Sequence, residues 1–272
     1  MPVKVNKNGW LITLILFVSS VLLRLFSIRM DLGKTYNYVL YGLVTAAVLF
    51  IALTVYKSNT VYSHAFDKSG PVIINAFAYL SAVGFFADFV LQCVNVYKSI
   101  DSGAYKSLIA FAPLCLTCAF ALLSSFCFVS VGLSYSNDYY DFRALKLLHA
   151  APLCWALTRI LSVLSNVVKF SADADIIIKY TAMIFALCFF YKFASETEND
   201  KATDRGFVFV CRAYSYIGAF YFVSRVLMLT VGRQDFHISA DDNFFALCVL
   251  FSSSFAYFLQ NNISKDSGAN TK

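Results

Sequence analysis

Long apolar stretches separated by short polar segments run along the whole chain. A helix needs about 20 mainly apolar residues to cross the hydrocarbon core of a bilayer. Eight stretches reach that length, and we expect transmembrane helices at roughly 9–29, 36–56, 71–97, 106–133, 144–169, 175–194, 207–231 and 243–261. The pattern predicts an all-α, polytopic membrane bundle that forms a single membrane domain over residues 1–272.

Composition and charge agree with lipid as the solvent. The chain is 59% hydrophobic and 14% charged, whereas soluble domains carry about 25% charge. The net charge of +6 comes from basic residues that flank the apolar runs, so it indicates topology and gives no support to nucleic-acid binding. The bilayer is the expected partner, and the sequence leaves protein partners open.

The distribution of Lys and Arg predicts the orientation. Outside the deep parts of the spans, eleven lie on the side of the N-terminus and seven on the opposite side. The positive-inside rule then places both termini in the cytoplasm. Short loops and an N-terminal apolar stretch without a small-residue cleavage site favour the plasma membrane, with a bacterial source as the expectation.

The second part of the chain repeats features of the first. At an offset of 135 residues, charged and Tyr-Lys positions coincide in order: Arg24 with Arg159, Lys34 with Lys169, and Tyr56-Lys57 with Tyr191-Lys192. A duplication predicts two four-helix halves, about 8–137 and 138–264, which enter the membrane in the same direction because four is even. Transporters are often built from such parallel repeats, with a substrate site between them. Shared membrane composition is the alternative explanation.

Ionisable side chains deep within the predicted spans are the candidate site residues. Arg24, Asp88, Arg159 and Arg225 each lie about 22–27 Å from the membrane end that carries the termini, and therefore in one layer. Asp88 is the only acid deep in a predicted span. A charge at the bilayer centre costs about 2.5–3.5 kcal/mol on insertion scales, so it usually faces protein or water.

Gln92 and Ser162 complete this candidate site, because helical spacing puts them on the faces of Asp88 and Arg159. We expect Asp88 to pair with one arginine, and the surplus positive charge to bind a small anionic or amphipathic ligand. Two other readings stay open. Arg24 and Arg225 are long enough to reach the interface, and Asp88 with Arg159 would then be a structural pair.

The remaining motifs give little support to chemistry. All eight cysteines lie in apolar stretches, where we expect small hydrophobic side chains. Cys115 and Cys118 have C-x-x-C spacing, but in a charge-free stretch without further ligands. No nucleophile with a base, metal-ligand set or phosphate-binding loop is present in the sequence. We therefore expect no enzyme activity, no cofactor and no metal.

Two functions compete on this reading. The first is a transporter or permease-like protein with a solute site between the two halves. The second is a non-catalytic receptor, regulator or assembly subunit whose polar core is structural. A membrane enzyme ranks third.

Overall fold

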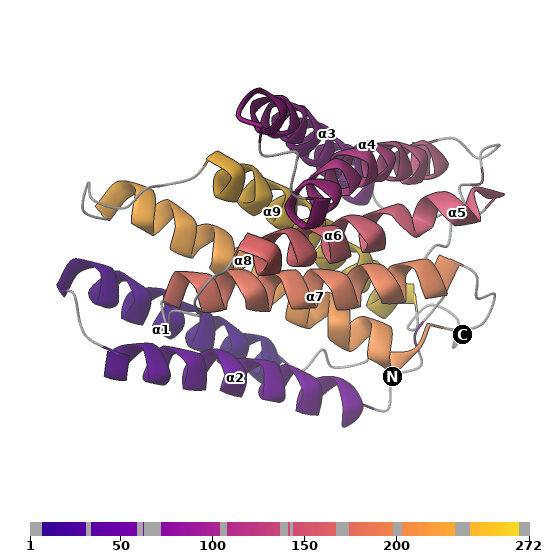
Figure 1. Cartoon of the computed structure of the whole chain (residues 1–272). Helices are drawn as coiled ribbons and strands as arrows, with labels where there is room; N and C mark the ends of the chain where they lie inside the picture. The colour runs from indigo at the N-terminus through magenta and orange to yellow at the C-terminus, as the bar shows by residue number, and fades with distance from the viewer. Residues whose placement is uncertain are drawn as a thin grey trace.

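The computed structural model describes residues 7–30, 34–58, 62, 72–103, 108–136, 141, 144–166, 174–197, 203–231 and 240–266. These ranges form nine helices (Figure 1), namely α1 Lys7–Met30, α2 Lys34–Tyr56, α3 Val72–Asp101, α4 Leu108–Ser136, α5 Lys146–His149, α6 Ala151–Asn166, α7 Ala174–Thr197, α8 Arg205–Val231 and α9 Ala240–Asp266. Within these described ranges, eight helical segments are long and apolar enough to cross a membrane. The predicted all-α architecture and its eight spans are thereby confirmed.

The fifth span departs from the prediction in one respect. A single helix over 144–169 was expected, but a short α5 is followed by a turn at Ala150 before α6 begins. Pro152 explains the break, because proline has no N–H to donate to the carbonyl oxygen of Leu148 four residues earlier. The amide of Cys154 then bonds the carbonyl oxygen of Ala150 at 3.0 Å and restarts the helical ladder.

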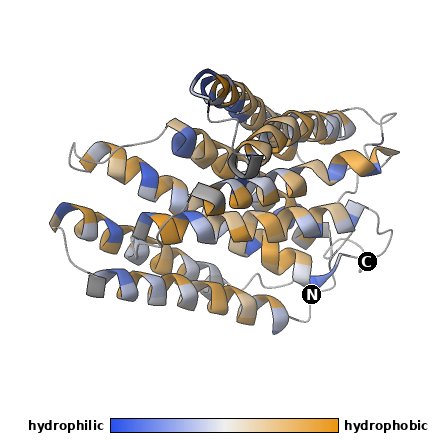
Figure 2. Cartoon of the chain, in the orientation of Figure 1, coloured by the Kyte–Doolittle hydropathy of each residue, from blue (hydrophilic) through white to orange (hydrophobic). Residues whose placement is uncertain are grey.

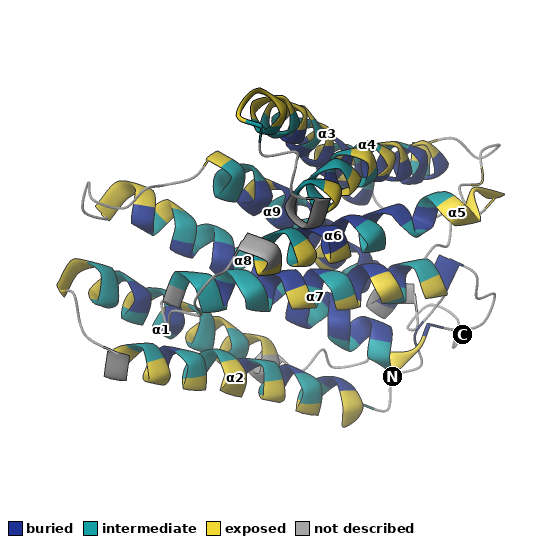
Figure 3. Ribbon diagram, in the orientation of Figure 1, coloured by how far each residue is buried: buried dark blue, intermediate teal, exposed yellow. Residues whose placement is uncertain are grey.

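Many of the exposed positions on the helices are hydrophobic, as the colouring by hydropathy and by burial shows (Figures 2 and 3). Large exposed hydrophobic residues occur on helices all around it, among them Leu49, Leu53, Val83, Phe126 and Ile184. A soluble monomer rarely exposes apolar surface on this scale, because contiguous apolar patches drive association in water. The chain is therefore a multi-pass membrane protein, and these faces are its contact with lipid.

α8 lies at the centre of the arrangement and is the most buried of the spans. It packs against α1, α2, α7 and α9, while α3 packs against α4 and α9, and α6 packs against α4 and α7. Small residues permit close approach, since a Cβ added to Gly218 of α8 would lie 2.5 Å from the Cβ of Ser253 on α9. α1 packs against α2 and α8, whereas α6, its expected counterpart in the repeat, packs against α4 and α7. The duplication therefore stays a prediction.

An aromatic cluster in the core fixes one wall of the polar layer described next. Trp155 of α6 is fully buried, with ring centroids 4.8 Å from Phe85 of α3 and 5.8 Å from Phe245 of α9. Packing on two helices leaves the indole little freedom. Its N–H is therefore held in one direction, and the N–H of a buried tryptophan usually has a hydrogen-bond partner.

Candidate functional site: a layer of paired charges with a cavity

Asp88 and Arg159 form a buried ion pair between α3 and α6. Arg159 donates to Asp88 Oδ1, and Trp155 Nε1 donates to Asp88 Oδ2 at 2.8 Å. Both charged side chains are almost completely buried. A buried carboxylate is tolerated when it is paired and its oxygens accept hydrogen bonds. The expectation that Asp88 pairs with one arginine is met here.

A second carboxylate reaches Arg159 from α9. Arg159 Nη1 donates to both oxygens of Asp241 at 2.7 Å, and Gln92 Nε2 bridges the two acids, at 2.7 Å from Asp241 Oδ1 and 3.2 Å from Asp88 Oδ1. Asp241 is the second residue of α9, whereas Gln92 lies about 14 Å before the end of α3. α9 therefore begins well inside the bundle, and its first turn carries the acid to the arginine.

Arg24 finds its partner in the same way. Its Nη2 donates to Asp175 Oδ1 at the start of α7, and its Nε donates to Ser224 Oγ of α8 at 3.1 Å. Arg24 itself is only 4% exposed, so it is held inside the bundle and does not extend to the interface. Asp175 is again the second residue of its helix.

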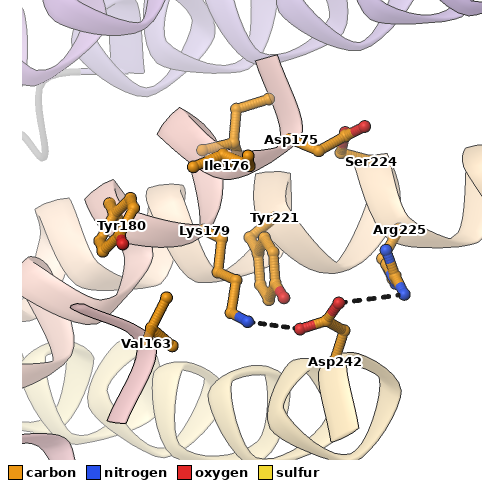
Figure 4. Close-up of a pocket in the computed structure, with 10 residues that line it drawn as sticks. Val163, Asp175, Ile176, Lys179, Tyr180, Tyr221, Ser224, Arg225 and Asp242 are labelled. Atoms are coloured by element: carbon orange, nitrogen blue, oxygen red, sulfur yellow. Dashed lines mark hydrogen bonds and ion pairs between the residues drawn. The ribbon is translucent and has the colours of Figure 1, made fainter. Parts of the chain in front are cut away.

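The third pairing joins α7, α8 and α9. Asp242 accepts from Lys179 Nζ at 2.5 Å and lies 3.6 Å from Arg225 Nη2 (Figure 4). Arg225 also donates from Nε to Asn243 Oδ1 at 3.0 Å. Two cations thus share one carboxylate. These ion pairs, from Arg24–Asp175 to Arg159–Asp88, are called the charged layer below, and they involve α1, α3, α6, α7, α8 and α9.

The layer differs from the expected site in its charge. Its ion pairs join four cations to four carboxylates, namely Arg24, Arg159, Lys179 and Arg225 with Asp88, Asp175, Asp241 and Asp242. Among the described residues, the ion pairs of the layer therefore show no surplus of positive charge, in contrast to the expectation from the sequence. Three of the acids were not among the expected site residues, because Asp175 stands at the very start of the predicted span 175–194 and Asp241 and Asp242 precede the span 243–261.

A signal for these acids does exist in the sequence. Asp175, Asp241 and Asp242 come directly before apolar helical runs, where the partial positive charge of a helix N-terminus favours carboxylates. They stand in the first turns of α7 and α9. These turns lie beside Arg24 of α1 and Gln92 of α3, both of which precede the ends of their own helices. Sequence position alone gives no depth for a helix start, because loop conformation sets it.

A partly enclosed cavity of about 180 Å³ opens into this layer between α6, α7, α8 and α9. Its charged lining consists of Asp175, Lys179, Arg225 and Asp242. Tyr221 also lines it, and Figure 4 shows the hydroxyl of this residue pointing toward the Asp242 carboxylate. Within the described residues this buried hydroxyl has no hydrogen-bond partner. The cavity thus combines ion pairs with an unsatisfied polar group.

The six site residues expected from the sequence do not all lie at the cavity. Arg225 lines the cavity and Arg24 supports it through Asp175, whereas Asp88, Arg159 and Gln92 belong to the buried network beside it. Ser162 is half-buried on α6 and is absent from the cavity wall. All four helices that line the cavity belong to residues 138–264, so it lies within the second expected half, with Arg24 reaching it from the first.

Other chemistry is sparse in the part of the chain that the structure describes. No three His, Cys, Asp or Glu side chains are placed there to hold a metal ion. The eight cysteines are free thiols, although Cys93 Sγ of α3 lies 3.4 Å from Cys118 Sγ of α4. On the side of the membrane that carries the termini, Arg212 donates from Nε to Gln260 Oε1 at 2.7 Å. Comparison with protein families, curated proteins and solved structures finds no match.

Proposed function

We propose that this multi-pass membrane protein is a permease that binds a small anionic or amphipathic solute in the cavity between α6, α7, α8 and α9. The observation that carries the proposal is the cavity at the charged layer, with Lys179, Arg225 and Asp242 in its wall. Ionisable residues within a membrane usually mark a solute or ion pathway, because burying them without such a role is costly.

The position of two helix starts supports this reading. α7 and α9 begin next to the cavity with Asp175 and Asp242 in their first turns. Transporters commonly place the ends of helices at the substrate site, where unpaired backbone groups and charged side chains can meet a ligand. The expected duplication, with halves at 8–137 and 138–264, belongs to the same proposal, as do the plasma membrane, cytoplasmic termini and the absence of catalysis.

A receptor, regulator or assembly subunit is the second candidate. The observation in its favour is the network around Arg159, in which Asp88 and Asp241 are both paired, although Arg159 Nε has no hydrogen-bond partner among the described residues. A bundle that needs only a rigid polar core would have its charges paired in this way. The cavity at Tyr221 distinguishes the two candidates, since a purely structural core does not need a cavity beside its ion pairs.

Accessibility from the two sides of the membrane tests the permease proposal without knowledge of the solute. Ser224 lines the cavity and is close in size to cysteine. In Ser224→Cys, we expect a membrane-impermeant maleimide to react from either side, because a permease opens its site alternately. The wild type, with its eight native cysteines, gives the background. Reaction from one side only would refute transport and favour the receptor or subunit.

A further inference from the structure

The ion pairs of the cavity wall are unevenly distributed over its charged residues. Lys179 and Arg225 both contact Asp242, so two cations share one carboxylate. Asp175, the other acid of the wall, is already paired with Arg24, which stands outside it. The opposite imbalance lies in the neighbouring network, where Arg159 serves two acids away from the cavity. Lys179 and Arg225 therefore line the cavity with one shared carboxylate, Asp242, between them.

A hydrogen-bond donor without a partner faces the same space. Tyr221 is 4% exposed, and its ring is held 5.6 Å from that of Phe245. Its hydroxyl has no hydrogen-bond partner among the residues that the structure describes, and it points into the cavity (Figure 4). Leaving a buried hydroxyl unsatisfied destabilises a fold. An acceptor oxygen from a ligand would remove that penalty.

Most of the remaining cavity wall is apolar. Val163 of α6 and Ile176 and Ile178 of α7 line it together with Tyr180, and Ser224 of α8 adds a hydroxyl. Ligand sites commonly combine a mainly apolar wall with a few polar groups that fix orientation. An acidic headgroup near Lys179 would therefore be followed by a short apolar chain against these side chains.

We propose that the cavity binds the headgroup of an amphipathic monoanion, held by the Lys179 ammonium, the Arg225 guanidinium and the Tyr221 hydroxyl. This inference rests on the proposed function, which it deepens by naming the class of solute. A carboxylate, sulfonate or phosphate diester on a short apolar chain has the required chemistry. Two sources could supply it, a free organic acid or the headgroup of an anionic lipid.

Hexanesulfonate is a suitable probe because it stays a monoanion at every working pH. We expect it to raise the unfolding temperature of the purified protein in a neutral detergent, with saturation that yields a Kd. Hexyltrimethylammonium and hexanol, which share the chain but not the charge, should have no such effect. Equal stabilisation by all three compounds, or by the cation alone, would overturn the proposal.

Tyr221→Phe gives the sharpest test, because it should weaken ligand binding without lowering the unfolding temperature of the ligand-free protein. Without ligand, the variant should unfold at the same temperature as the wild type or higher, since it loses an unsatisfied hydroxyl. Its Kd for hexanesulfonate should rise about tenfold, as expected for a lost hydrogen bond to a charged group. A wild-type Kd in Tyr221→Phe would contradict the assignment, and the ligand-free unfolding temperature shows that the fold is intact.

Lys179→Gln should weaken binding at least tenfold as well, because the shared carboxylate of Asp242 would then face one cation. Arg212→Gln is the matched control. It also removes a hydrogen-bonded basic residue, but one that bonds Gln260 away from the cavity. Its Kd should equal that of the wild type. A similar loss in both variants would mean that overall charge, and not the cavity, governs binding.

Lipid composition distinguishes the two sources. In nanodiscs of phosphatidylcholine alone, hexanesulfonate should bind as in detergent. If phosphatidylglycerol abolishes this binding, the natural occupant is a lipid headgroup, and if the Kd is unchanged, it is a free solute. No binding in either membrane overturns the proposal. A failure here leaves the two-sided labelling of Ser224→Cys unaffected, so the solute class and the transport function fail separately.

Discussion

Removal of Arg159 should destabilise the protein more than removal of either acid beside it. In Arg159→Leu, Asp88 and Asp241 would remain near each other without the guanidinium between them. Removing one partner of a buried ion pair typically costs about 3–5 kcal/mol, because the other charge stays buried and uncompensated. Here two carboxylates lose their partner, so we expect the loss to fall at the upper end of that range.

Asp88→Asn should be milder. Arg159 would keep Asp241, to which it donates at 2.7 Å from each oxygen, and only the bonds to Asp88 would weaken. A hydrogen bond to a charged group contributes about 1.5–3 kcal/mol, which sets the expected loss. The free energy of unfolding, measured by titration with a denaturing detergent in mixed micelles, compares these variants on one scale.

The double variant with Arg159→Leu and Asp88→Asn tests the sign of the interaction free energy between the two substitutions. Asp88→Asn should partly rescue Arg159→Leu, because it removes the fully buried one of the two carboxylates that contact Arg159. The interaction free energy of the cycle should therefore be favourable, in the range of about 0.5–3 kcal/mol that neighbouring residues show. The reasoning is refuted if Arg159→Leu is no more destabilising than Asp88→Asn, or if the second substitution adds its full cost to the first.

Three further predictions concern packing and the membrane surface. Gly218→Ala should lower the free energy of unfolding by about 1–3 kcal/mol, because its Cβ would lie 2.5 Å from an α9 side chain, and an unchanged value would contradict this contact. Mild oxidation should join Cys93 to Cys118, whose sulfurs are 3.4 Å apart, and peptide mapping that finds both thiols free would argue against the packing of α3 on α4. Burial raises the pKa of Asp204, but the hydrogen bond and charge of Lys192 and nearby backbone N–H groups more than offset this, so the pKa lies below its usual value. This stabilisation, less than about 1 kcal/mol for an exposed pair, should be present above about pH 4 and be lost as the pH falls through the lowered pKa; Asp204→Asn should abolish that part of the acid sensitivity, and an unchanged pH profile would refute the pairing.

The sequence predicts the fold well because hydropathy depends on local composition. Each span needs only enough consecutive apolar residues, and this holds even for the helix from Ala174 to Thr197, where lysines stand at positions 179 and 192. The break before Ala151 was missed, although Pro152 could have indicated it. The duplication cannot be tested by hydropathy in this way, since it concerns how two halves of the chain are related in space and not the length of a helix.

The candidate site was predicted only in part, for a physical reason. Arg24, Asp88, Arg159 and Arg225 all take part in ion pairs between helices, whereas their common depth, which follows from residue counts along straight helices, stays a prediction. Their partners come from the starts of α7 and α9, whose depth depends on the preceding loops. Tyr221 carried no signal at all, since a tyrosine in an apolar helix usually reports an interface or a packed core.

The most direct test of the account measures whether water reaches the cavity while the outer face of the same helix meets lipid. A nitroxide can be attached to a ketone-bearing unnatural amino acid at Ser224 or at Val226 of α8, which leaves the native cysteines in place. Ser224 lines the cavity, and Val226 is exposed on the outside. In liposomes, the account predicts that relaxation at 224 responds to a water-soluble nickel complex and that relaxation at 226 responds to oxygen dissolved in lipid. A nitroxide at 224 that responds to oxygen alone, as at 226, would contradict it.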